Sequence, residues 1–276
     1  MAGKQPGIKR RLTIVELPVL RIVGQSLWLP FRYLRELAKY GWIPFLLSLC
    51  AKAINFLIVR EDAPAYVSQI WMMAAHLALF TPFSVTWTKL AIYGRGSIAN
   101  DPPFVYARTE WRYLLATILM MVAFVIIAVP PLALLRYGQA NFDNQIVAIA
   151  GLLTVAALFL VALGFFRVAA FVFPAIAIDK YAGLSAAWRQ TAGNLERLVA
   201  ILILSYLPYY IVRKILDRAI GYQPPGLKAA AAAFVEMLLV ALVTTGLAGS
   251  ALAYKTIVLD EHEDSPAVSA SSQSSQ

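Results

Sequence analysis

Six long runs of apolar residues constrain the fold of this chain more than any other feature of its sequence. A helix needs about 20 residues to cross a hydrocarbon layer about 30 Å thick, and most of the runs reach that length. Backbone groups inside a bilayer must form their hydrogen bonds within the segment, so the runs are expected to be helices. The expected membrane-spanning segments are 42–59, 66–92, 113–135, 146–173, 198–212 and 229–257.

The composition supports this fold class. The chain has 276 residues, of which 60% are hydrophobic and 14% are charged. Soluble domains are about half apolar and carry about a quarter charged residues, so one soluble core could not absorb this apolar surplus. We therefore expect an all-α integral membrane protein, with six helices in three hairpins over residues 27–258. A basic segment, 1–26, precedes this domain, and an acidic, Ser-rich tail, 259–276, is expected to be disordered.

The distribution of Lys and Arg predicts the orientation of the helices. If the N-terminus is cytoplasmic, the connections on that side carry sixteen of these residues and the opposite side carries six. Positive residues favour the cytoplasmic side, so both termini are expected in the cytoplasm. The connection 213–228 argues against this orientation, since it places four basic residues outside. No cleavable signal sequence precedes the first run, so 42–59 is expected to be an uncleaved anchor.

Three basic amphipathic stretches, beginning at residues 27, 104 and 184, precede alternate spans and are expected to form interfacial helices. The first is expected over 27–39, the second has Asp101 as its N-cap, and the third has Ser185. Their similar spacing predicts a threefold repeat of interfacial helix and transmembrane hairpin, with units 27–103, 104–183 and 184–258. The alternative is that any basic cytoplasmic connection of this length looks amphipathic.

Tryptophan and arginine side chains are expected to anchor these stretches at the cytoplasmic surface, with the rings at headgroup depth and the arginines toward anionic lipid. The expected interfacial anchors are Trp28, Arg32, Arg35, Arg108, Trp111, Arg112, Arg167, Trp188 and Arg189. The expected partners are therefore membrane lipids of the anionic cytoplasmic leaflet, with other membrane proteins as further candidates. The net charge of +9 is attributed to this membrane surface and not to nucleic acid.

The sequence carries no motif of a catalytic, cofactor or metal site. The two histidines, His76 and His262, lie far apart, and the single cysteine, Cys50, lies within an apolar run. Residues 94–99 have the GxGxxG spacing of a dinucleotide-binding loop, but they follow an apolar run instead of a strand, which indicates a cytoplasmic turn. We therefore expect neither an enzyme nor a bound cofactor or metal.

Four polar residues, Lys52, Asn55, His76 and Glu236, are expected near the middle of the bilayer. With a helix rise of about 1.5 Å per residue, Lys52 and His76 each lie about 15 Å from the start of their runs, and Glu236 about 12 Å from an interface. A charge at this depth destabilises insertion by about 2.5–3.5 kcal/mol. The layer is either a structural ion pair between Lys52 and Glu236 or a relay for protons or substrate.

The last apolar run contains a group of small residues, which predicts close packing against a neighbouring helix. Small side chains let helix backbones approach each other inside a membrane. The group consists of Thr244, Thr245, Gly246, Gly249 and Ser250.

Two adjacent segments carry the pattern of a known family: residues 166–179 read FRVAAFVFPAIAID and residues 183–194 read GLSAAWRQTAGN. These segments resemble bacterial six-span membrane proteins, including the membrane domain attached to some glycerophosphoryl diester phosphodiesterases and related families of unknown function. The close resemblance covers only 166–194 and implies a location in the bacterial inner membrane. It does not imply phosphodiesterase activity, which in that family belongs to a separate soluble domain that this sequence lacks.

The leading functional hypothesis is a non-enzymatic, multi-pass inner-membrane protein that acts as a scaffold or accessory subunit or associates with lipids. The alternative is a small transporter or lipid-handling protein that uses the polar layer of Lys52, Asn55, His76 and Glu236. A water-filled cavity that reaches this layer would favour transport, and a closed, dry bundle would argue against it. An intramembrane enzyme is the third hypothesis.

Overall fold

The computed structural model describes residues 17–58, 65–141, 144–181, 183–221, 235, 240 and 243–259. This part of the chain consists of helices and turns and contains no strand. The helices are α1 (Val19–Arg32), α2 (Leu34–Ile58), α3 (Ala65–Tyr93), η1 (Arg95–Ile98), α4 (Arg108–Asn141), α5 (Asn144–Ala177), α6 (Leu184–Gln190) and α7 (Leu195–Gly221). A last apolar helix, Val243–Leu259, ends in a π-helical turn, η2 (Lys255–Leu259).

Four helices are long and apolar enough to cross a membrane, and they coincide with four of the six expected spans. They comprise Ile70–Tyr93, Arg108–Ala133, Val147–Ala177 and Leu195–Leu216. The expected span 42–59 lies within α2, apart from residue 59, which is outside the described residues, and α2 is not among these four. Of the expected span 229–257, the structure describes residues 235, 240 and 243–257.

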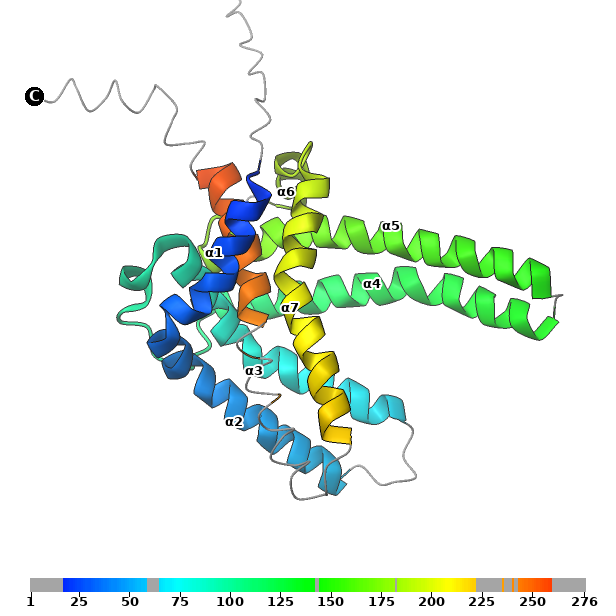
Figure 1. Cartoon of the computed structure of the whole chain (residues 1–276), viewed down its shortest axis with the longest axis horizontal. Coiled ribbons are helices and arrows are strands. Elements are labelled where there is room, and N and C mark those ends of the chain that lie inside the picture. The colour runs from blue at the N-terminus through cyan, green and yellow to red at the C-terminus, as the bar shows by residue number, and fades with distance from the viewer. Residues whose placement is uncertain are drawn as a thin grey trace, which may run out of the picture.

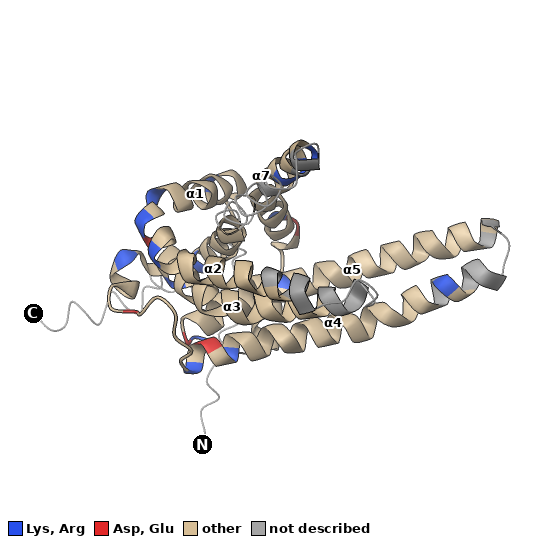
Figure 2. Cartoon of the chain, turned by 90° about the horizontal axis from the view of Figure 1, so that it is seen from below, with Lys and Arg blue, Asp and Glu red and all other residues tan. Residues whose placement is uncertain are grey.

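Helices α4 and α5 lie side by side and extend well beyond the other helices (Figures 1 and 2). Their shafts carry few charged residues (Figure 2), and many of their apolar side chains are exposed. Leu152 is 71% exposed, Leu160 67% and Ile126 65%. An apolar surface of this extent requires cover by lipid or by another protein.

The core lies where α1, α3, the inner end of α5, α7 and the last helix meet (Figure 1). The small residues of the last helix are buried there, with Ala248, Ala251 and Ala253 completely inaccessible. Their packing is reinforced by hydrogen bonds, since Trp87 Nε1 donates to the Thr244 carbonyl at 3.0 Å and Thr245 Oγ1 donates to the Ser205 carbonyl at 2.8 Å. The predicted close-packing face is confirmed.

The first expected interfacial helix, 27–39, is wrong in its bounds. The helix breaks at Tyr33 (φ −117°, ψ 38°), so that α1 ends at Arg32 and α2 begins at Leu34. The amphipathic helix is α1 itself, which starts at Val19 and so crosses the expected boundary between 1–26 and 27–258. Packing of the apolar face of α1 beside α7 decides where this helix begins and ends. The apolar periodicity within 27–39 alone does not show these bounds.

The second expected interfacial helix does not form as a separate element, because residues 101–107 are not helical and the rest of the stretch, from Arg108, is the first part of α4. Asp101 is not an N-cap: its carboxylate lies 3.5 Å from Lys89 Nζ, and its carbonyl accepts a hydrogen bond from Tyr40. Glu110, in the first turn of α4, caps the start of this helix instead, because its carboxylate accepts a hydrogen bond from the Ala107 backbone N–H at 3.0 Å. A first-turn carboxylate satisfies an otherwise unpaired donor at the helix start.

The third expected interfacial helix exists as α6, but it is shorter than expected. The residue before it is Gly183 (φ 97°), so Ser185 is not the N-cap, and no side chain caps this end. The helix stops at Gln190, and residues 191–194 turn the chain before α7 begins. The expected turn at 94–99 is confirmed, with Gly94 in the left-handed region (φ 80°) and η1 directly after it.

Candidate functional site

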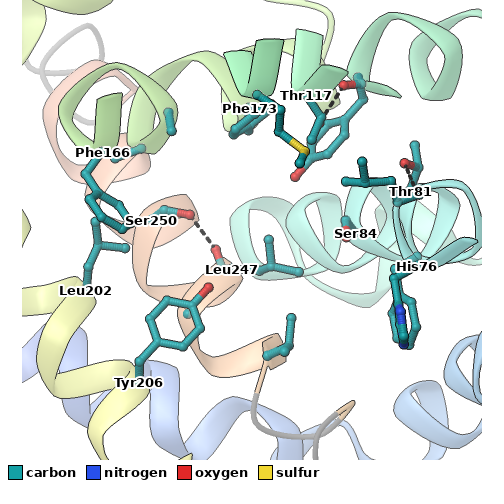
Figure 3. A pocket seen from close by; sticks show the side chains of 18 of the residues that line it. His76, Thr81, Ser84, Thr117, Phe166, Phe173, Leu202, Tyr206, Leu247 and Ser250 are labelled. Atoms are coloured by element: carbon teal, nitrogen blue, oxygen red, sulfur yellow. Dashed lines mark hydrogen bonds between the residues drawn. The ribbon is translucent and has the colours of Figure 1, made fainter. Parts of the chain in front are cut away.

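A cavity of about 550 Å³ lies where α3, α4, α5, α7 and the last helix converge (Figure 3). Its walls are mainly apolar. The apolar lining residues include Met73, Leu77, Phe80, Met121, Phe166, Phe173, Leu202, Val243 and Leu247. The polar lining residues are His76, Thr81, Ser84, Tyr113, Thr117, Tyr206 and Ser250.

Each wall of the cavity is a stripe on one helix face. Helix α4 contributes residues 113, 117 and 121, and the last helix contributes 243, 246, 247 and 250. Residues three or four positions apart lie on the same side of a helix, so each stripe is a local property of the sequence. Hydroxyl residues at this spacing within apolar runs are the signal that could have identified the site.

The hydroxyls of Thr81, Thr117 and Ser250, which line the cavity, donate to carbonyls of their own helices. Thr81 Oγ1 donates to the Leu77 carbonyl at 2.6 Å, and Ser250 Oγ donates to the Leu247 carbonyl at 2.9 Å (Figure 3). Thr117 bonds its helix in the same way at 2.9 Å. Since each hydroxyl has one proton, these oxygens present acceptor lone pairs to the cavity.

Both ring nitrogens of His76, in α3, form hydrogen bonds, and the one at Nε2 links α3 to α2. Nδ1 lies 2.7 Å from the Met72 carbonyl, which can only accept, so Nδ1 carries a proton. Nε2 lies 3.0 Å from Oγ of Ser48, a side chain that is 1% exposed, and in the neutral ring Nε2 accepts that hydroxyl proton. The ring also stacks on Phe80, with the centroids 5.8 Å apart.

Only one member of the expected polar layer has a described side chain. The side chains of Lys52 and Asn55, in α2, and residue Glu236 lie outside the described residues, so the Lys52–Glu236 pair remains a prediction. The described partners of His76 are Ser48 and the Met72 carbonyl. Because Ser48 lies opposite His76, the backbone of Lys52 is about 6 Å further along α2.

The expected interfacial tryptophans are exposed, and so are the expected arginines other than Arg167: Trp28, Arg32, Arg35, Arg108, Trp111, Arg112, Trp188 and Arg189. Arg167 instead joins α5 to α6. Its guanidinium lies 4.0 Å from the ring centroid of Trp188, Nε donates to Thr191 Oγ1 at 2.6 Å, and Nη2 donates to the Trp188 carbonyl at 2.7 Å. A planar cation with several donors suits this combination of stacking and hydrogen bonding.

Comparison with known proteins adds no functional assignment. No family model, curated protein or solved structure matches this chain. The resemblance of residues 166–194 to bacterial six-span proteins therefore remains a prediction, and function must be argued from the cavity and the surfaces of the molecule.

Proposed function

We propose that this chain is a non-enzymatic membrane protein that binds a lipid-like molecule in the central cavity. The observation that carries the proposal is a cavity of about 550 Å³ with apolar walls and a few fixed hydroxyl groups. Sites for small ligands usually have volumes of about 300–1,000 Å³ and combine an apolar lining with a few polar groups. The exposed apolar surfaces of α4 and α5 support a location within a lipid bilayer.

The ligand is a neutral amphiphile that carries a hydrogen-bond donor, such as a long-chain alcohol or amide. Apolar contact alone gives little selectivity in a membrane, since lipid tails are as apolar as the cavity wall. Selectivity must then come from the polar groups. Thr81, Thr117 and Ser250 offer acceptors because their protons bond their own helices.

We place the protein in the cytoplasmic (inner) membrane of a bacterium, with six spans and both termini in the cytoplasm. The excess of Lys and Arg in the connections on that side supports this orientation. Anionic lipids of the cytoplasmic leaflet are then its general partners, because they attract the exposed arginines around α1, α4 and α6.

A diazirine-bearing long-chain alcohol tests the proposal, with the protein in phosphatidylcholine nanodiscs. After illumination, mass spectrometry is expected to find labels on peptides containing Met73 and Met121, which line the cavity. Replacing Ala169, another lining residue, with Phe places a ring in the cavity. Labelling should fall about tenfold, which corresponds to about 1.4 kcal/mol of binding free energy.

Ala157→Phe is the matched control, because Ala157 lies on the same helix and is exposed. This variant should retain wild-type labelling. Equal labelling of the two Phe variants, or labels spread evenly over the exposed faces of α4 and α5, would contradict a cavity site.

The transporter alternative depends on Lys52 and Glu236 and has a separate test. Each is replaced with Gln, singly and together, and the free energy of unfolding is measured. A coupled pair gives a double-variant loss that differs from the sum of the single losses, whereas additive losses would rule out the pair.

A further inference from the structure

A second pocket, of about 470 Å³, lies between α1, the end of α3 and the last helix. Three cationic side chains line it: Arg21 and Arg32 from α1, and Lys255 from η2. The described lining residues include no Asp or Glu. Gln25, Tyr33, Tyr93 and Thr256 add polar groups, so the pocket combines positive charge with hydrogen-bonding side chains.

The cations of this pocket differ from three other basic residues near the same end of the molecule, which form ion pairs. Arg95 Nε lies 2.7 Å from Glu36, Lys89 lies 3.5 Å from Asp101, and Arg112 Nη1 lies 3.4 Å from Asp179. Within the described ranges, no carboxylate lies within ion-pair distance of Arg21, Arg32 or Lys255. Three like charges around one concave surface create a positive potential that favours an anion.

Helix geometry explains how the charges are assembled. Arg21, Gln25, Trp28 and Arg32 follow one stripe of α1, at spacings of three and four residues, and this stripe covers about 16 Å. Lys255 comes from the opposite side, at the first residue of the π-helical turn that ends the last helix. Such π turns are rare and occur frequently at functional sites.

The surroundings of the pocket favour a lipid as the source of the anion. Trp28 lies on the pocket and is 66% exposed, and Phe31, beside it, is 69% exposed, with the ring centroids 5.8 Å apart. Figure 2 shows basic residues on the same helix, α1. An amphipathic helix that presents exposed aromatic rings beside arginines is typical of segments that lie at the lipid headgroups.

We infer that this pocket binds the phosphate of an anionic lipid headgroup through Arg21, Arg32 and Lys255. Phosphate accepts several charge-assisted hydrogen bonds, and arginine supplies them in a planar fork. The site is separate from the central cavity, so the inference does not depend on the proposed function. It also differs from a general attraction of exposed arginines to an anionic surface, because it requires particular residues.

Binding is tested with the full chain in a neutral detergent and with dioctanoyl phosphatidylglycerol as the probe, counted by native mass spectrometry. The double variant Arg21→Gln/Lys255→Gln should weaken binding by about tenfold for each cation removed. The matched control Arg108→Gln/Arg189→Gln removes the same charge from exposed positions outside the pocket and should bind as the wild type does. Equal losses in the two double variants would overturn the inference in favour of a delocalised attraction.

Two further binding measurements distinguish a lipid headgroup from other anions that could occupy the pocket. Glycerol phosphate supplies the phosphate without acyl chains, and binding as tight as that of the lipid would overturn a lipid headgroup as the ligand. Glu261→Gln/Glu263→Gln neutralises part of the acidic segment that follows η2. If the lipid binds only to this last variant, the chain's own carboxylates occupy the pocket and the inference is wrong. Unchanged lipid binding in this variant supports it.

Discussion

Replacing Gly246 with alanine is expected to destabilise the protein by about 1–2 kcal/mol. A Cβ at this position would lie 2.2 Å from Cζ of Tyr206 and 2.5 Å from its hydroxyl oxygen, well inside van der Waals contact. Overpacking of this kind costs about 1–3 kcal/mol. Alanine recovers up to about 1 kcal/mol because it favours a helix more than glycine does. The Tyr206 ring must move, and its open side is the central cavity.

Two other glycines provide a matched series. A Cβ at Gly249 would lie 2.9 Å from Oγ of Ser205, so Gly249→Ala should cost less than Gly246→Ala. A Cβ at Gly164, in α5, would meet no atom within 4 Å. Gly164→Ala should therefore stabilise the protein by up to about 1 kcal/mol through helix propensity alone.

The free energy of unfolding of each variant is measured by denaturant titration in one detergent, followed by far-UV circular dichroism. The titration is repeated with Tyr206→Ala, which removes the ring that obstructs the new methyl group. In that background Gly246→Ala should no longer destabilise, so the coupling energy should equal the steric cost of about 1–3 kcal/mol. The reasoning is refuted if Gly246→Ala loses the same free energy with and without the ring, or is as stable as Gly164→Ala.

The remaining predictions concern three contacts between helices or turns. Ser48→Ala removes the hydroxyl that bonds Nε2 of His76 and should lower the unfolding free energy by about 1–2 kcal/mol; an unchanged titration midpoint would count against this contact. Arg167→Lys keeps the charge but loses the planar stacking on Trp188, which should cost about 0.5–1 kcal/mol, and this part of the loss should disappear in a Trp188→Leu background, whereas the part due to the hydrogen bonds to Thr191 and to the backbone carbonyl of residue 188 should remain. Tyr40→Phe leaves two backbone carbonyls without their buried donor and should cost about 1–2 kcal/mol, with faster amide hydrogen exchange in the adjacent turn as the local measurement.

The sequence by itself identified the helical character of the chain, because the length of an apolar run is a local property. Four expected spans coincide with helices long and apolar enough to cross a membrane. The small residues of 244–250 were recognised in the same way, since a group without bulky side chains has few uses other than close packing. The turn at 94–99 followed from its glycines and from its position directly after an apolar run.

Helix starts and the candidate sites were decided by tertiary structure. Asp101 has the right chemistry for an N-cap, yet its position beside Lys89 and Tyr40 places it in a turn, and Glu110 caps the helix. Of the cavity's polar residues, only His76 was expected to belong to a polar site, because counting residues gives depth along a helix but not the rotation of that helix toward its neighbours.

The basic pocket illustrates this difference most clearly. Arg32 was expected to face anionic lipid, and its position on an amphipathic stretch was sufficient for that prediction. Its association with Lys255 could not be read from the sequence, because the two residues are more than 200 positions apart and meet only through the packing of α1 beside the last helix. The residue pattern within a helix shows which of its faces is apolar and which is charged. The way the helices cross decides which faces come into contact.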